Sequence, residues 1–365
     1  MNKAFKFRLY PNAEQIVIFA KTFGCCRFIY NKMLGDKITH YNETKQDLYC
    51  YPSQYKTDFP FLKEVDSLAL VGAYNNLKTA YKNFFRNKNV GFPKFKSKKN
   101  HHYSYTTNCV NDNIKTKDGY IVLPKVGAIK MKQHRIIPEH YILKSVTVSK
   151  TPSGKYYASI LFEYEQIIPP VDMKIPIGLD FSMAELYVDS NGDEPHYDRY
   201  YRRSLAKLQK MSRTLSKMKK FSNNWYKQKH KIAILHEKIA NQRKDFLHQR
   251  SREIANSCDL VGVEDLNMKS MSQALNFGKS VADNGWGMFR TLLKYKLEDQ
   301  GKYFVVIDKW FPSSKKCSTP NCDYINKDLD LSVREWICPE CGVVHNRDVN
   351  AAVNIKNEAM RVFSA

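Results

Sequence analysis

The sequence predicts an α+β protein with more than one domain, and three observations support this prediction. Strand-like and helix-like segments alternate in the first half of the chain. The proline pair Pro169-Pro170 then interrupts the pattern and marks the best domain boundary. Beyond it, short apolar strands end in acidic residues, and four cysteines follow them. At 365 residues the chain is long enough for two or three domains, each with its own hydrophobic core.

The first half predicts one strand, then helices, then several strands. Residues 5–10 alternate like a strand, a helix begins at 11–15, and helical spacing resumes over 67–85. Antiparallel strands are expected further on, at residues 120–123, 145–150 and 155–162. These strands favour a small β-barrel.

The second half begins with a short strand at residues 175–180 and a hairpin return. A long helical region follows over residues 202–252, and the polar run 222–224 is expected to break it into a helical hairpin. Further strands are predicted at residues 260–264 and 303–308, and a final helix at 349–355. Trp286 is expected to belong to the core rather than to a base-stacking platform.

The charge of the chain calls for a polyanionic partner. The formal net charge is +23 and the pI is near 9.5, which makes nucleic acid the leading candidate and a membrane surface a weaker one. Sixteen Lys or Arg residues stand against two acids between residues 202 and 252. A surface of this kind repels itself unless phosphates neutralise it, so we expect the helical hairpin to face nucleic acid.

A second basic segment, residues 91–103, interleaves lysines with aromatic residues around Gly and Pro. It predicts an irregular loop that contacts phosphates, and a solvated linker is the alternative. The candidate nucleic-acid-binding residues along the whole chain are Lys94, Lys96, Lys98, Lys99, Arg202, Arg203, Lys219, Lys220, Arg243 and Arg347.

The sequence shows no signal peptide and no apolar run long enough to cross a membrane, so a soluble intracellular protein is expected. It is expected in the cytoplasm of a prokaryote, associated with the nucleoid. Of the nine cysteines, the five outside the C-terminal group are scattered, and they are expected to be reduced thiols.

Three acids stand at the ends of predicted elements. Asp180 and Glu264 each end an apolar strand, and Asp348 begins the final helix. Singly, each is more typical of a solvated turn or a helix cap than of a metal ligand. Together they can converge at one sheet edge, where their mutual repulsion makes sense chiefly around divalent cations, with Mg²⁺ as the natural occupant. Such a site can hydrolyse phosphodiesters, which is nuclease chemistry.

The four cysteines form two pairs separated by fifteen residues, and they predict a tetrahedral zinc site. This site is expected to be structural and to place Asp348 a few residues downstream. The ligands are Cys317, Cys322, Cys338 and Cys341.

Taken together, these motifs resemble the TnpB family, the RNA-guided nucleases encoded by insertion sequences and related to the type V CRISPR effectors. The resemblance spans essentially the whole chain. It rests on the four cysteines and on residues 7–11, 91–96, 178–180, 263–266, 310–314 and 346–352. The first cysteine pair differs from the family, since four residues separate its members where two are usual. A longer loop still permits tetrahedral coordination.

The resemblance implies a domain organisation. A wedge β-barrel would comprise residues 1–10 and 91–170, interrupted by a helical recognition insert at 11–90. An RNase-H-like RuvC α/β domain would span residues 171–365. Within it, the basic helical hairpin would lie at 202–256 and a zinc-ribbon insertion at 312–344.

The resemblance also implies an activity, a metal-dependent RNA-guided DNA endonuclease that hydrolyses phosphodiester bonds. Its catalytic metal ligands would be Asp180, Glu264 and Asp348, with Mg²⁺ bound or, alternatively, Mn²⁺. Its partners would be a noncoding guide RNA and double-stranded target DNA with a short adjacent motif, bound by a monomeric protein. A reader of that motif is expected between Asp66 and Tyr74 and around the basic loop.

Two other functions remain as alternatives. A nuclease-inactive RNA-guided DNA-binding regulator of transposition or transcription would need the basic surfaces but no catalysis. A conventional transposase would join strands rather than only cut them. Retention of all three acids favours the cutting enzyme.

Three residues near Asp348 keep open roles. His345 is expected to pack locally or to contact a phosphate, because four thiolates already complete a structural zinc site. Arg347 would either contact the scissile strand or pair with a neighbouring acid. Asn350 would orient a ligand or a water molecule, or serve the start of the helix.

Overall fold

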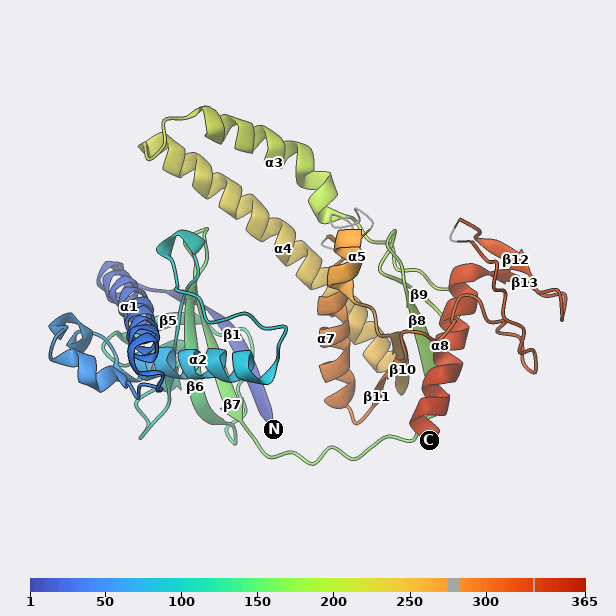
Figure 1. Cartoon of the computed structure of the whole chain (residues 1–365), viewed down its shortest axis with the longest axis horizontal. Coiled ribbons are helices and arrows are strands. Elements are labelled where there is room, and N and C mark those ends of the chain that lie inside the picture. Colours follow the sequence, from blue (N-terminus) through green and yellow to red (C-terminus); the bar gives the residue numbers. More distant parts are fainter. Residues whose placement is uncertain (275–282, 331) are drawn as a thin grey trace. The chain divides into compact units, whose positions relative to one another are not determined.

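The structure is a computed structural model that describes residues 1–274, 283–330 and 332–365. The chain divides into two compact units, Met1–Gln166 and Ile167–Ala365 (Figure 1). The division falls just before the proline pair. Among the described residues, no helix combines the length and apolar character needed to cross a membrane.

The first unit is built on a seven-stranded antiparallel sheet. The strand order is β2-β6-β7-β1-β5-β4-β3, and the sheet curls into a half-barrel with β2 and β3 at its two ends. The strands are β1 (Asn2–Tyr10), β2 (Tyr103–Asn108), β3 (Lys115–Lys117), β4 (Tyr120–Leu123), β5 (Gly127–Lys132), β6 (Ile142–Lys150) and β7 (Tyr156–Glu163). Their alternation of buried and exposed residues places one face of the sheet against the helices.

Two long helices pack on this sheet, α1 (Ala13–Thr44) and α2 (Ser67–Arg86). Asn12 and Gln15 form a capping box that starts α1, as a short polar side chain before an apolar helix favours. Phe19 of α1 stacks on Tyr156 of β7 with ring centroids 5.5 Å apart. The helices therefore share one hydrophobic core with the sheet. Short 3-10 helices lie at Pro52–Lys56, Pro60–Lys63 and Lys98–Asn100.

The second unit is a layered α/β structure. Its four-stranded sheet has the order β11-β10-β8-β9. The strands are β8 (Pro176–Phe181), β9 (Tyr187–Asp189), β10 (Leu260–Glu264) and β11 (Tyr303–Ile307). Strand β10 runs parallel to both β8 and β11, and β9 returns antiparallel to β8. Parallel pairing at the centre requires both faces of the sheet to be covered.

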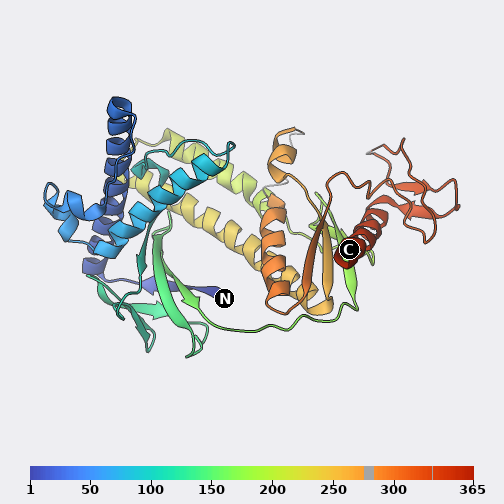
Figure 2. The same cartoon turned by 60° about the horizontal axis from the view of Figure 1, so that its bottom comes forward.

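Helices cover both faces (Figure 2). On one face α4 (Asn223–Ser257) and α7 (Trp286–Glu298) pack on a core that includes Leu179, Val263 and Trp286. Trp286 is 1% exposed, so its expected place in the core is confirmed. On the other face lies α8 (Arg347–Ser364), whose Ile355 and Ala359 are fully buried against the sheet. A short helix, α5 (Met268–Ala274), follows β10.

A helical hairpin extends from this unit, formed by α3 (Tyr200–Lys217) and the first half of α4 (Figure 1). The predicted break is confirmed, but it lies at residues 218–222: Ser222 caps α4, and Asn223 and Asn224 already belong to that helix. A small ribbon precedes α8 and pairs β12 (Glu335–Ile337) with β13 (Val344–Asn346).

Candidate metal centres

Strand register brings the first two acids together. Leu179 of β8 is paired with Val263 of parallel β10, so Asp180 and Glu264 occupy the next position on neighbouring strands. Side chains in register on parallel strands point to the same face. Leu179 and Val263 belong to the core beneath α4 and α7. The two carboxylates therefore point to the opposite face, toward α8.

Two glycines allow α8 to approach that face closely. Gly178 and Gly262 are paired in register, two residues before the acids, so they share the acids' face. A Cβ at Gly262 would lie 2.6 Å from the Cβ of Ala359 and 2.9 Å from the carbonyl oxygen of Ile355. A Cβ at Gly178 would clash with the backbone of α8 at Ala352. The sheet has no side chains at Gly178 and Gly262, so the backbone of α8 packs directly against the strands there.

Because α8 packs closely on the sheet, its first turn, which contains Asp348, lies near the carboxylate of Asp180. Asn346 caps the helix by accepting hydrogen bonds from the N–H groups of Asp348 and Val349 at 3.0 and 3.1 Å. A carboxylate in the first helical turn is also favoured by the helix dipole. Asp348 forms an ion pair at 3.1 Å with Arg334, whose side chain is 71% exposed. Such a pair is weak, so the carboxylate stays available to another cation.

The electrostatics fit a cation site. Burial, together with the neighbouring carboxylates of Glu264 and Asp348, raises the pKa of Asp180 well above its ordinary value. Burial also raises the pKa of Glu264. A group of carboxylates that is costly to ionise without a cation, and that offers only oxygen donors, suits Mg²⁺. These oxygen donors are of the type that Mg²⁺ prefers. Among the described residues, however, only the four cysteines have ligand atoms that lie close enough together to hold an ion.

A hydrogen-bond network holds Glu264 from the side of the ribbon. The hydroxyl of Ser313 donates to Oε1 of Glu264, which opposes the effect of burial on the pKa of that carboxyl. The Ser313 carbonyl accepts from Nδ2 of Asn354 at 2.8 Å. One turn earlier on α8, Asn350 donates to the Lys316 carbonyl at 2.8 Å and accepts from the N–H of Ser318 at 3.0 Å. Two buried asparagines of α8 thus anchor residues 313–318, and this segment in turn contacts Glu264.

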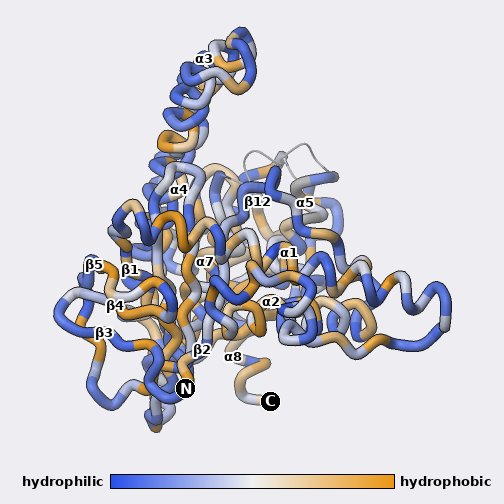
Figure 3. Tube along the Cα trace, turned by 90° about the vertical axis from the view of Figure 1, so that its left-hand side faces the viewer, coloured by the Kyte–Doolittle hydropathy of each residue, from blue (hydrophilic) through white to orange (hydrophobic). Residues whose placement is uncertain are grey.

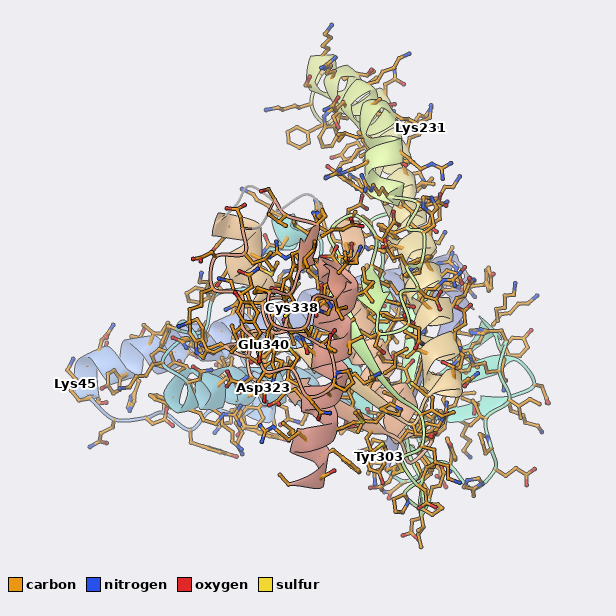
Figure 4. All side chains as sticks on the ribbon, turned by 90° about the vertical axis from the view of Figure 1, so that its right-hand side faces the viewer. Lys45, Lys231, Tyr303, Asp323, Cys338 and Glu340 are labelled. Atoms are coloured by element: carbon orange, nitrogen blue, oxygen red, sulfur yellow. The ribbon has the colours of Figure 1, made fainter. Side chains whose placement is uncertain are left out.

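The four cysteines of the ribbon have the geometry of a tetrahedral thiolate site. The Sγ atoms of Cys317, Cys322, Cys338 and Cys341 all lie within 4.8 Å of one another. Those of Cys317 and Cys341, and those of Cys322 and Cys338, are 3.7 Å apart. Tetrahedral zinc with bonds of about 2.3 Å requires sulfur atoms about 3.8 Å apart. A hydrogen bond from the N–H of Val343 lowers the pKa of Cys341 to about 6, which favours the thiolate that binds metal. Burial raises the pKa of Cys317 in the same cluster. Figure 4 views the unit from the ribbon, with Cys338 labelled.

The three residues with open roles have distinct environments. His345 is buried, with Nε2 3.1 Å from Sγ of Cys317 and its ring 4.9 Å from that of Trp336. Arg347 is also buried, and its guanidinium donates to the carbonyl of Asp330 at 2.8 Å. It holds the ribbon to the start of α8, and its positive charge also lowers the pKa of the neighbouring Asp180. Asn350 anchors residues 316–318, as described above.

The other candidate nucleic-acid-binding residues lie in both units. On the basic loop, Lys94, Lys98 and Lys99 are exposed, and the ammonium of Lys96 lies 4.1 Å from the ring centroid of Tyr30. Asn31 of α1 anchors this loop with two hydrogen bonds to the backbone of Lys96, at 2.7 and 2.9 Å. On the hairpin, Arg243 is half-buried, Arg203 pairs with Asp198 at 2.7 Å, and Arg202, Lys219 and Lys220 are exposed.

Sequence reasoning missed several residues that position the site. Ser313 and Asn354 are examples, although Asn350 and Asn354 stand four residues apart and so share one face of a helix. Asn284 was also missed, and it donates to the carbonyl of Ser182 at 2.9 Å, in the turn that follows Asp180. Asp283 accepts from the N–H groups of Tyr201 and Arg202 at 3.1 and 3.3 Å, and so caps α3 across a long stretch of sequence. No local pattern signals such contacts.

Comparisons with known proteins bear on the whole chain. A family profile described as "Probable transposase", of the IS605 OrfB type, matches residues 159–275. A "Cas12f1-like, TNB domain" profile matches residues 286–355, and a "Helix-turn-helix domain" profile matches residues 1–46. In this structure, residues 1–46 contain β1 and α1.

Two full-length relatives carry the name "Putative RNA-guided DNA endonuclease". The one from Streptomyces pristinaespiralis is 35% identical over 365 residues, which covers 97% of this chain and 89% of the relative. InsQ of Escherichia coli K12 is 32% identical over 378 residues, covering 97% and 91% respectively.

A solved structure of similar fold is the cryo-EM structure of the Cas12f1-sgRNA-target DNA complex. Its TM-score is 0.60 at 15% identity, and the match covers 98% of this chain and 99% of that one. At this identity the likeness concerns the fold alone. With the relatives' identity and coverage, and with the motifs in their expected order, the chain belongs to the TnpB family of the IS605 OrfB type.

Proposed function

We propose that this protein is an RNA-guided DNA endonuclease encoded by an insertion sequence, with a RuvC-type site at the edge of the β8-β10 sheet. The observation that carries the proposal is the juxtaposition of Asp180 and Glu264 in register, beneath a helix whose first turn contains Asp348. The names of the full-length relatives support the same activity. The matching order of acids, cysteines and basic segments supports it further.

In this proposal Asp180, Glu264 and Asp348 hold Mg²⁺, with Mn²⁺ as an alternative. When bound, the metal supplies a Lewis acid for the scissile phosphate and lowers the pKa of an attacking water. Asp180 and Glu264 are rigid ligands because they extend from strands. Asp348 approaches from α8, so the distance between helix and sheet sets the size of the site. The hydrogen bond from Ser313 orients the carboxylate of Glu264 and favours its ionised form, against the larger effect of burial.

The four cysteines would hold one zinc ion with a structural role. Four thiolates fill the coordination sphere and leave no open position for substrate. The ribbon would then be an insertion of the nuclease domain, anchored to α8 by Arg347, Asn350 and Asn354. We propose three functional domains: a wedge barrel at residues 1–10 and 91–170, a helical recognition insert at 11–90 and a RuvC-like domain at 171–365.

The proposed partners are a noncoding guide RNA and double-stranded DNA with a short adjacent motif, bound by a monomeric protein. Their phosphates would be contacted by the lysines of the basic loop and by Arg202, Arg203, Lys219, Lys220 and Arg243. Base pairing would read most of the target, and the protein would read only the adjacent motif. Because its substrate is DNA, the protein would act at the nucleoid of a prokaryotic cell.

The test uses the protein purified with its copurifying RNA. The RNA is sequenced, and the complex is offered double-stranded DNA with randomised flanking sequence and Mg²⁺. Cleavage is expected next to one short motif. Asp180→Ala and Glu264→Gln should bind the target without cutting it, whereas Asp265→Asn, which changes an exposed neighbouring acid, should cut normally.

Undiminished cleavage by Asp180→Ala would refute the assigned site. Binding without cutting by the unmodified protein would instead identify a regulator. Joined strands in the products would identify a conventional transposase.

A further inference from the structure

The turn at the tip of the helical hairpin contains an exposed aromatic residue, Phe221, whose backbone has an unfavourable conformation. Phe221 lies between α3 and α4 with φ of 68°, in the left-handed region that disfavours bulky side chains. Among the described residues, it is the one large apolar residue with a positive φ. Its side chain is 73% exposed. The fold therefore bears a conformational cost here without burying the ring, which is a feature typical of functional positions.

Phe221 is the most exposed of three neighbouring rings. Its centroid is 5.7 Å from that of Trp225, which is 5.1 Å from that of Tyr226. Tyr226 is also 52% exposed. The N–H of Trp225 is capped by the hydroxyl of Ser222 at 3.2 Å, so the rings stand on the ordered first turn of α4. The tip is thus a small aromatic platform on a rigid support.

The surroundings of this platform are strongly basic. No Asp or Glu occurs between residues 213 and 236. Exposed lysines flank the rings on both helices and in the turn between them: Lys217, Lys219, Lys220, Lys227 and Lys231. Figure 3 shows that the hairpin is largely hydrophilic and extends away from its own unit, and Figure 4 labels Lys231 on it.

These features fit one class of partner. Exposed rings flanked by lysines match unpaired nucleotides, whose bases stack on aromatic faces while their phosphates meet the ammonium groups. A base within an intact duplex offers no free face for stacking.

We propose that the tip of the α3–α4 hairpin, residues 217–231, binds an unpaired nucleotide segment by stacking a base on Phe221. The inference deepens the proposed function, on which it rests, because that function supplies two such segments. These are the unpaired parts of the guide RNA and the DNA strand exposed when the guide pairs.

The experiment measures binding rather than cleavage, so that its failure is distinct from failure of the nuclease assignment. The full-length protein in an Asp180→Ala background is titrated into three probes of one sequence. They are single-stranded RNA and single-stranded DNA, each carrying 2-aminopurine, and blunt duplex DNA. Dissociation constants are recorded at several salt concentrations.

Four variants separate the contributions. Phe221→Leu keeps an apolar side chain but removes the ring, and it should weaken single-strand binding by at least about fivefold and restore 2-aminopurine fluorescence. Phe221→Tyr keeps the ring and should bind like the parent protein. Phe221→Gly should melt at the same or a higher temperature, because glycine accepts a positive φ, and yet bind single strands weakly. Lys219→Ala with Lys220→Ala should reduce the dependence on salt, by about 0.7 in slope per lost phosphate contact.

The duplex should respond to the lysine changes but not to Phe221→Leu. A greater loss for RNA would assign the tip to the guide, and a greater loss for DNA would assign it to the exposed target strand. Either result supports the proposal. Unchanged single-strand affinity in both Phe221→Leu and Phe221→Gly would overturn it, and so would an equal loss for the duplex.

Discussion

The hydroxyl of Ser313 donates a hydrogen bond to Oε1 of Glu264, although forty-nine residues separate them in the sequence. Ser313 is itself anchored through its carbonyl by Asn354 of α8. The loop before the cysteine ribbon, the last helix and a central strand therefore meet at one carboxylate. This relationship connects the structural part of the second unit to its proposed catalytic edge.

The first prediction concerns Ser313→Ala. Burial raises the pKa of Glu264 and the hydrogen bond from Ser313 lowers it, so removing the hydroxyl should raise that pKa further. The acidic limb of the pH–cleavage profile should move to higher pH. Because a hydrogen bond to a charged group contributes about 1.5–3 kcal/mol, cleavage near the acidic limb should fall roughly tenfold or more. Ser313→Thr keeps the hydroxyl and should restore the profile. An unshifted profile in Ser313→Ala would show that the bond does not affect ionisation.

The second prediction concerns Asp180→Asn in the absence of metal. The pKa of Asp180 is raised in the folded state, so stability is fully present below the ordinary pKa of an aspartate and falls as pH rises through the folded value. At neutral pH without metal, Asp180→Asn should therefore melt higher, by about 2–4 °C for each kcal/mol gained. Mg²⁺ should stabilise the unmodified protein and not the variant. Scanning calorimetry in EDTA and in Mg²⁺ tests this, with Asp265→Asn as control. A lower melting temperature for Asp180→Asn in EDTA would contradict it.

The third prediction concerns the close packing of α8 against Gly178. Gly178→Ala places a methyl group against the α8 backbone at Ala352, which cannot move aside without shifting the helix. We expect a destabilisation of about 1–3 kcal/mol, with cleavage reduced more than folding because Asp348 moves with the helix. Gly287→Ala is the matched control, since nothing lies within 4 Å of its added Cβ. Thermal melting and cleavage rates are compared for both. Equal melting temperatures and equal cleavage rates for the two variants would contradict this role of Gly178.

The fourth prediction concerns the cysteine cluster. Elemental analysis of the purified protein should find one zinc per chain, because the four Sγ atoms already have tetrahedral spacing. Cys338→Ser should lose the ion and change the fluorescence of Trp336, which lies 4.9 Å from His345 in the ribbon. Cys109→Ser, outside the cluster, should retain zinc. Full zinc content in Cys338→Ser would refute the site.

Much of the secondary structure could be predicted because its signals are local. The apolar runs ending in Asp180 and Glu264 are strands β8 and β10, and the polar break at Ser222 separates the two helices of the hairpin. The spacing of the cysteines likewise predicted a cluster, since thiol pairs in short loops have few other arrangements. Helix α7 was not anticipated, although its buried residues Trp286, Phe289, Leu293 and Leu297 follow helical spacing.

By itself, the sequence determined the residue types of the candidate site: three acids at element ends, four cysteines and a basic hairpin. Only the tertiary structure decided which residues meet. Register placed Asp180 beside Glu264, paired glycines admitted α8, and Ser313 reached Glu264 from a distant loop. It also buried Arg347, which the sequence had suggested for nucleic-acid contact. The reason is physical, because periodicity and capping act between near neighbours, whereas these contacts depend on how separate elements pack against one another.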